Sequence, residues 1–238
     1  MRWTEKRLGG WSLLVGSAAV AVGYALSPGR GAVDTVPSTS LSDLTLAMAR
    51  NEALSYTVPI VIIFGAVLML HGLVTLWRHA APVPRLGLLA MAIALALQMV
   101  MRGFDYMITG MGVASLESSG TESEEWLKSA VHLQRVVWGL LFTSNVAGLA
   151  GIAVVALGFA FRPEPLRLPP VLNGIVAVLA VASLVVFVTA WHSDRLELAF
   201  APVFAAMSVA GLVYMVLLGW GLASSKDIRA SEPDSEAL

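Results

Sequence analysis

Charged and polar side chains recur at helical spacing in the third long apolar stretch of the chain. Gln98, Arg102, Asp105 and Thr109 are four, three and four residues apart, so one face of a helix would carry all of them. Arg102 and Asp105 are also spaced to form an ion pair along that helix. Because a charge inside a membrane is costly and normally faces protein or water, this face predicts either a binding site or a structural ion pair.

A second polar set lies in the next apolar stretch. Lys128, His132 and Arg135 would share one helix face, and Gln134 and Trp138 an adjacent one. Counting along both stretches places the two sets at the same outer level of the membrane. The functional hypothesis is an outward-facing site for a ligand or ion, formed by Gln98, Arg102, Asp105, His132 and Arg135. The structural alternative is that the ion pair only locks two helices together, while Arg135 extends to the lipid headgroups.

Histidine and methionine suggest two further chemistries. A membrane haem needs two histidines at similar depth on facing helices, and His132 with His192 is the pair of matching depth. Thioethers suit Cu(I), and Met107 and Met111 lie one turn apart on a helix, where His132 would complete the site. Methionine is also a common filler of apolar interfaces. His71, in the inner half of the second apolar stretch, is interpreted as a packing residue.

Recognisable catalytic motifs are missing from the sequence. It contains no phosphate-binding glycine loop, no His-Glu-x-x-His motif and no nucleophile elbow. The absence of cysteine excludes disulfides and thiolate ligands. The 15 basic and 16 acidic residues leave no basic surplus for nucleic acid. We therefore expect a non-enzymatic protein with no identifiable cofactor, whose partners are membrane lipid and either other membrane subunits or further copies of itself.

The composition indicates that lipid is the solvent for much of the chain. Of its 238 residues, 57% are hydrophobic and 13% charged, against about 25% charged in a soluble domain. We predict an all-α, polytopic membrane bundle of about six transmembrane helices. It would form a single domain over residues 1–225, with helices at approximately 8–28, 54–77, 86–110, 124–161, 169–191 and 198–223. The first of these is expected to be a retained helix rather than a signal peptide.

Loop charges predict the orientation of the bundle. With the N-terminus inside, nine Lys and Arg residues lie in inside segments and four in outside loops, and short cytoplasmic loops favour Lys and Arg. The nine are Arg2, Lys6, Arg7, Arg78, Arg85, Arg162, Arg167, Lys226 and Arg229, and the four are Arg30, Arg50, Lys128 and Arg195. An even number of spans then places both termini in the cytoplasm. The polar segment 226–238 is expected to be a disordered cytoplasmic tail.

Two segments on the predicted outer side have sequence signals of their own. Ser40-Leu-Ser-Asp43 resembles a helix-capping pattern and predicts a short helix over about 41–52. Residues 110–123 are rich in Gly, Ser and acidic residues, which favours a mobile loop. The helix predicted to run from about 124 to 161 would be about 60 Å long, so its first turns must project beyond the membrane or the helix must tilt.

These observations favour an accessory or structural subunit of a complex in a bacterial inner membrane. A small transporter or carrier that uses the polar cluster is the alternative, and a haem- or copper-binding protein is a further one. The tight cytoplasmic loops, the more elaborate outer loops and the absence of catalytic motifs favour the subunit.

Overall fold

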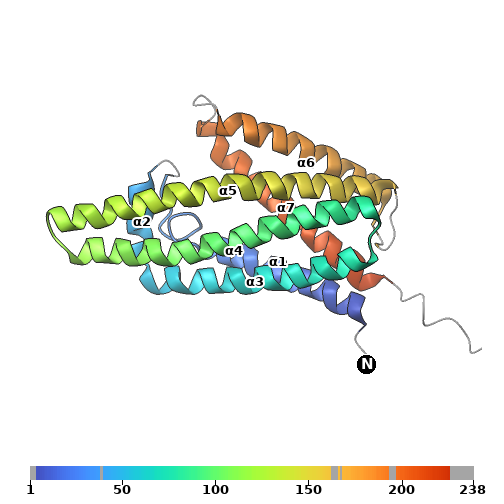
Figure 1. Ribbon diagram of the computed structural model, residues 1–238, viewed down its shortest axis with the longest axis horizontal. Helices are drawn as coiled ribbons and strands as arrows, with labels where there is room; N and C mark the ends of the chain where they lie inside the picture. The colour runs from blue at the N-terminus through green and yellow to red at the C-terminus, as the bar shows by residue number, and fades with distance from the viewer. Residues whose placement is uncertain (1–3, 38–39, 162–165, 167, 193–196, 226–238) are drawn as a thin grey trace, which may run out of the picture.

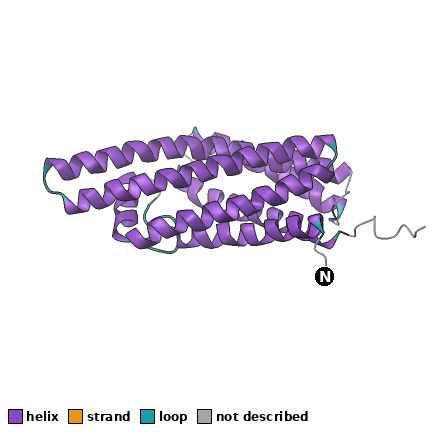
Figure 2. Ribbon diagram, turned by 60° about the horizontal axis from the view of Figure 1, so that its bottom comes forward, coloured by secondary structure: helices purple, strands orange, loops and turns teal. Residues whose placement is uncertain are grey.

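The computed structural model describes residues 4–37, 40–161, 166, 168–192 and 197–225, and for 197–207 only the backbone. All regular secondary structure in these segments is helical (Figures 1 and 2). The helices are α1 (Glu5–Leu26), α2 (Leu41–Arg50), α3 (Glu52–His79), α4 (Pro82–Glu117), α5 (Thr121–Phe161), α6 (Pro170–Trp191) and α7 (Glu197–Ser224). The predicted all-α fold class is confirmed.

The long helices run up and down along one axis, and short α2 lies at one end (Figure 1). Five described helices, α1, α3, α4, α5 and α6, are long and apolar enough to cross a membrane. Large apolar side chains such as Phe64, Leu86 and Val178 are exposed on the outside of the helices, where lipid would cover them. The structure therefore fits a multi-pass integral membrane protein.

The sixth predicted span and the tail remain predictions. Helix α7 covers the predicted range 198–223, but its described side chains give only the shorter apolar segment Ser208–Ser224. The predicted tail, 226–238, lies outside the described residues.

The predicted mobile loop at 110–123 is wrong for most of its length. Helix α4 continues to Glu117 and α5 already begins at Thr121. Gly112 allows α4 to pack against α2, since a Cβ there would lie 3.0 Å from the Ala49 Cβ. Ser115 and Ser123 exchange hydrogen bonds between hydroxyl and carbonyl groups, at 2.9 and 2.7 Å. These contacts close a helical hairpin where composition alone suggested a loop.

The α4–α5 hairpin extends well past the other helices at the end where α2 lies (Figure 1). At 1.5 Å per residue, the 36 residues of α4 span about 54 Å and the 41 of α5 about 60 Å. The hydrocarbon core of a bilayer is only about 30 Å thick. The predicted excess length of the 124–161 helix is therefore confirmed, and α4 shares it.

The short helix predicted at 41–52 is confirmed as α2. The Ser40 hydroxyl accepts a hydrogen bond from the Asp43 backbone N–H at 3.3 Å, as a helix N-cap does. Leu44, Thr45 and Met48 are buried, and α2 packs mainly against α4 and α5. Helix α2 therefore covers the bundle beside the base of the projecting hairpin.

Glycine residues bring two pairs of helices into backbone contact. A Cβ at Gly16 of α1 would lie 2.5 Å from the Gly65 carbonyl oxygen of α3, and a Cβ at Gly65 would lie 2.8 Å from the Gly16 carbonyl. Gly87 of α4 and Gly151 of α5 form the same reciprocal contact, at 2.6 and 2.8 Å. Close approach of this kind is a main source of helix association in lipid.

Replacing Gly16 with alanine should therefore destabilise the bundle by about 1–3 kcal/mol, because the new methyl group meets a backbone carbonyl that cannot move aside. Gly139→Ala is the matched control, since a Cβ at Gly139 has no atom within 4 Å in the described residues. A Gly-to-Ala change inside a helix otherwise stabilises by up to about 1 kcal/mol. Thermal unfolding in detergent, followed by tryptophan fluorescence, should give a lower midpoint for Gly16→Ala than for Gly139→Ala. Equal midpoints would refute the close contact.

Candidate functional site

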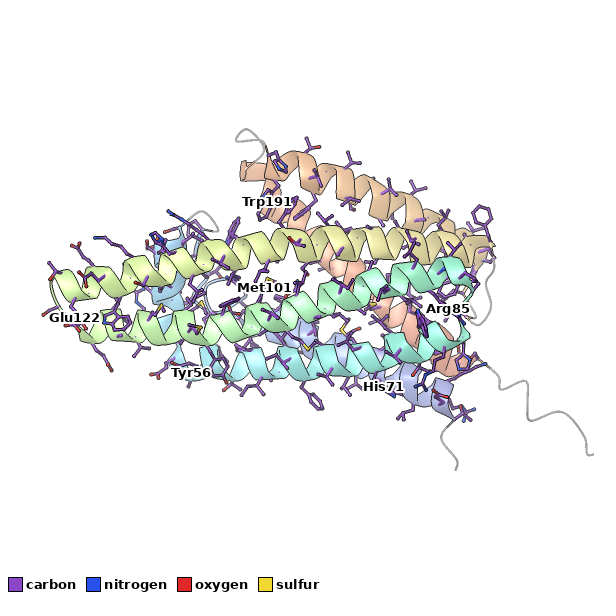
Figure 3. The ribbon with its side chains drawn as sticks, viewed as in Figure 1. Tyr56, His71, Arg85, Met101, Glu122 and Trp191 are labelled. Carbon is purple, nitrogen blue, oxygen red and sulfur yellow. The ribbon has the colours of Figure 1, made fainter. Side chains whose placement is uncertain are left out.

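The polar face predicted on the third stretch points into the protein. Arg102, Asp105 and Thr109 of α4 are 2%, 3% and 0% exposed. Arg102 Nη1 donates a hydrogen bond to Asp105 Oδ2 at 2.8 Å, which confirms the predicted ion pair. Figure 3 places Met101, the residue before Arg102, midway along the bundle between α4 and α5. The pair therefore lies inside the bundle and not on the projecting hairpin.

Arg30 is the second cation at this site, and sequence reasoning placed it only in an outer loop. Its Nη1 lies 3.7 Å from Asp105 Oδ1, and its side chain is 28% exposed. A turn after α1 carries Arg30 there: Gly29 has a φ of 77°, which favours glycine, and its N–H donates to the Val33 carbonyl at 2.9 Å. Burial lowers the pKa of Arg30, the Asp105 carboxylate opposes that shift, and the Arg102 cation adds to it.

A chain of polar contacts joins the ion pair to α1 and α5. The Arg102 guanidinium lies over the Tyr24 ring at 5.4 Å. The Tyr24 hydroxyl donates to Gln98 Oε1 at 2.6 Å, and Gln98 Nε2 donates to the Ser144 hydroxyl at 3.1 Å. That hydroxyl in turn donates to the Ala94 carbonyl at 3.0 Å. Gln98 thus connects three helices, and the hydrogen bonds satisfy its amide group inside the bundle.

A small cavity adjoins the ion pair. Its volume is about 20 Å³, which is enough for a water molecule or an ion of similar size. Sites for drug-sized ligands and cofactors occupy about 300–1,000 Å³. The cavity is lined by Ser27, Pro28, Arg30, Met48, Ser55, Val58, Pro59, Arg102 and Asp105.

Three polar groups at this cavity lack their usual partners. Arg102 Nε and Asp105 Oδ1 are buried and have no hydrogen-bond partner in the part of the chain that the structure describes. Pro59 lies inside α3 and has no N–H, so the Ser55 carbonyl lacks its helical donor. The protein therefore offers a small polar species one free donor, Arg102 Nε, and two free acceptors, Asp105 Oδ1 and the Ser55 carbonyl.

The structure does not bring His132 and Arg135 to this site. Both side chains are exposed on α5, and Lys128 forms an exposed ion pair with Glu124 at 3.2 Å. The adjacent face points inward instead, and buried Gln134 donates to the Thr45 hydroxyl of α2 at 2.9 Å. Of the five predicted residues, Gln98, Arg102 and Asp105 come together in space.

The candidate metal ligands occupy ordinary structural positions. His192 Nδ1 lies 2.8 Å from the Val188 carbonyl oxygen, and Met107 is 53% exposed, whereas Met111 is half-buried against the α2 side of the bundle. His71 Nδ1 contacts the Ser12 hydroxyl at 3.0 Å, as expected of a packing residue. Within the described residues there is no cluster of three or more His, Asp or Glu side chains that could hold a metal.

Figure 3 shows His71 toward the end of the bundle that carries the N-terminus. Trp191, next to His192, lies at the C-terminal end of α6, which is farther from that end of the bundle. His71 and His192 are therefore at different depths, as the sequence suggested.

The chain matches no protein-family model, no curated protein and no solved structure.

Asp105→Asn should destabilise the protein by about 3–5 kcal/mol, because it leaves the buried Arg102 guanidinium without its carboxylate partner. Glu124→Gln removes a carboxylate from an exposed ion pair, with both side chains 71% exposed, and should cost less than about 1 kcal/mol. Thermal unfolding of both variants in detergent measures the difference. Similar small losses for both would mean that the Arg102–Asp105 pair contributes no more than a surface pair.

Proposed function

We propose that this chain is a six-span protein of a bacterial cytoplasmic membrane, folded as a single helical bundle with both termini inside. We further propose that it acts as a non-enzymatic accessory or structural subunit of a membrane complex, joined to other subunits or to further copies of itself. The projecting α4–α5 hairpin is the observation that carries this proposal. The size of the cavity at the ion pair favours it over a carrier of organic substrates, because about 20 Å³ is far below the volume that such a ligand needs.

The hairpin offers a partner both apolar and charged groups. Leu116 and Trp126 are 49% and 39% exposed, and they lie among the exposed acidic residues Glu117, Glu122 and Glu125. Figure 3 shows Glu122 at the tip of the hairpin, far from Met101. Exposed Trp and Leu side chains outside the bilayer are unfavourable in water, which supports contact with a second protein.

The orientation can be tested with single cysteines, since the sequence has none. Ser118→Cys is in the turn between α4 and α5, and Ala81→Cys is in the turn between α3 and α4. A membrane-impermeant maleimide should label Ser118→Cys in intact spheroplasts, while Ala81→Cys should react only after lysis. The reverse pattern would place the hairpin in the cytoplasm and overturn the proposed orientation.

Purification of the tagged full chain in a mild detergent, followed by native mass spectrometry, tests the subunit role. We expect a defined complex, either with a stoichiometric partner or as an oligomer of the chain. Trp126→Glu should dissociate it, because the change places a charge in the proposed contact. Phe64→Ala is the control. It truncates a 60% exposed side chain on α3, away from the hairpin, and should leave the complex intact. A stable lone monomer that turns over or transports a substrate would contradict the proposal.

A further inference from the structure

The charges around the cavity do not balance. Arg30 and Arg102 contribute two positive charges, and Asp105 is the one acidic residue among the described residues that line the cavity. The cluster therefore carries one uncompensated positive charge. Because charges attract far more strongly in a medium of low dielectric than in water, a bound negative charge would neutralise it at a large electrostatic advantage.

Hydrogen-bond donors also exceed acceptors at this site. Two guanidinium groups present up to ten N–H donors, at five each, and one carboxylate presents about four acceptor positions. Arg102 Nε is buried with no acceptor among the described residues. Asp105 Oδ1 is close to a donor already, because Arg30 Nη1 is 3.7 Å away and a small side-chain movement would complete that bond. The Ser55 carbonyl at the same cavity still lacks a donor, so the demand for an outside acceptor comes from Arg102 Nε alone.

The cavity limits the size of this acceptor. A volume of about 20 Å³ accommodates a species not much larger than water. Val58, Pro59 and Met48 supply the apolar part of its wall, and Arg30, which is partly exposed, lies at its outer side. A large oxyanion or organic anion exceeds the volume of about 20 Å³ beside Arg102.

We propose that the cavity between Arg30, Arg102 and Asp105 is a binding site for a small monovalent anion of the size of chloride. The anion accepts hydrogen bonds from Arg102 and Arg30 and brings the net charge of the cluster to zero. It thereby links the loop after α1 to α4. This site differs from the predicted polar cluster, because Arg30 takes the place of His132 and Arg135.

The test uses the full-length protein in a non-ionic detergent, with sodium gluconate replaced stepwise by sodium chloride at constant ionic strength. Unfolding is followed through the fluorescence of its 7 tryptophans. The unfolding midpoint should rise and saturate with chloride, since a ligand of the folded state stabilises it by mass action. Bromide should act like chloride, and its anomalous scattering from crystals would locate it beside Arg102.

Variants of Arg30, at the outer side of the cavity, distinguish a specific anion site from a general effect of salt on stability. Arg30→Gln makes the cluster neutral and should weaken the apparent chloride affinity about tenfold or more. Arg30→Lys keeps the charge and should retain most of the response. Arg50→Gln, at an exposed position at the end of α2, is the matched control and should respond like the unmodified protein.

Several outcomes would overturn the proposal. Unfolding midpoints that do not depend on chloride would mean that the cavity holds water only. An equal chloride response in Arg30→Gln would indicate a general salt effect. A response to phosphate or to added phosphatidylglycerol, but not to chloride, would assign the arginines to a phosphate group instead. None of these results depends on whether the hairpin binds a partner, so the anion site and the subunit role can fail separately.

Discussion

The ion pair between Arg102 and Asp105 imposes the main constraint on this bundle. Two charges on one apolar helix can be buried only if neighbouring elements supply partners, because lipid supplies none. Here the partners are Tyr24 from α1 and Arg30 from the following loop. Gln98, one turn before the pair, extends the polar contacts to Ser144 of α5. The long helix α4 is therefore joined to both neighbouring parts of the molecule at the level of its charges.

Glycine contacts make these polar interactions geometrically available. Gly16 and Gly65 hold α1 against α3, and Gly87 and Gly151 hold α4 against α5. With the backbones this close, side chains as short as Ser144 reach across to the next helix. The apolar attraction between helices is weak in lipid, so close backbone packing and a few buried hydrogen bonds share the task of fixing helix positions.

Sequence periodicity predicted the face of α4 well, because Gln98, Arg102 and Asp105 lie on one helix and their spacing determines a shared direction. The N-cap at Ser40 was predictable for a similar local reason. The continuation of α4 into the hairpin was missed because Gly112 and Ser115 are poor helix formers alone, and their contacts with α2 and α5 outweigh that preference.

The position of Arg30 depended on a turn and on tertiary packing, neither of which has a periodic signal. On α5 the sequence offered two adjacent polar faces, and nothing in it showed that Gln134 rather than His132 would face inward. Charged side chains on a helix that leaves the membrane can be solvated, so the cost of burial, which made α4 informative, no longer distinguishes the faces of α5.

The length of α4 beyond its ion pair has a mechanical consequence. Glu117 lies 15 residues after Arg102 on one continuous helix, a distance of about 22 Å at 1.5 Å per residue. If α4 pivots about its buried charges, a rotation of about 10° moves the hairpin tip by about 4 Å over that arm. Any tilt of α4 about Arg102 and Asp105 would therefore displace the hairpin tip far more than the ion pair itself.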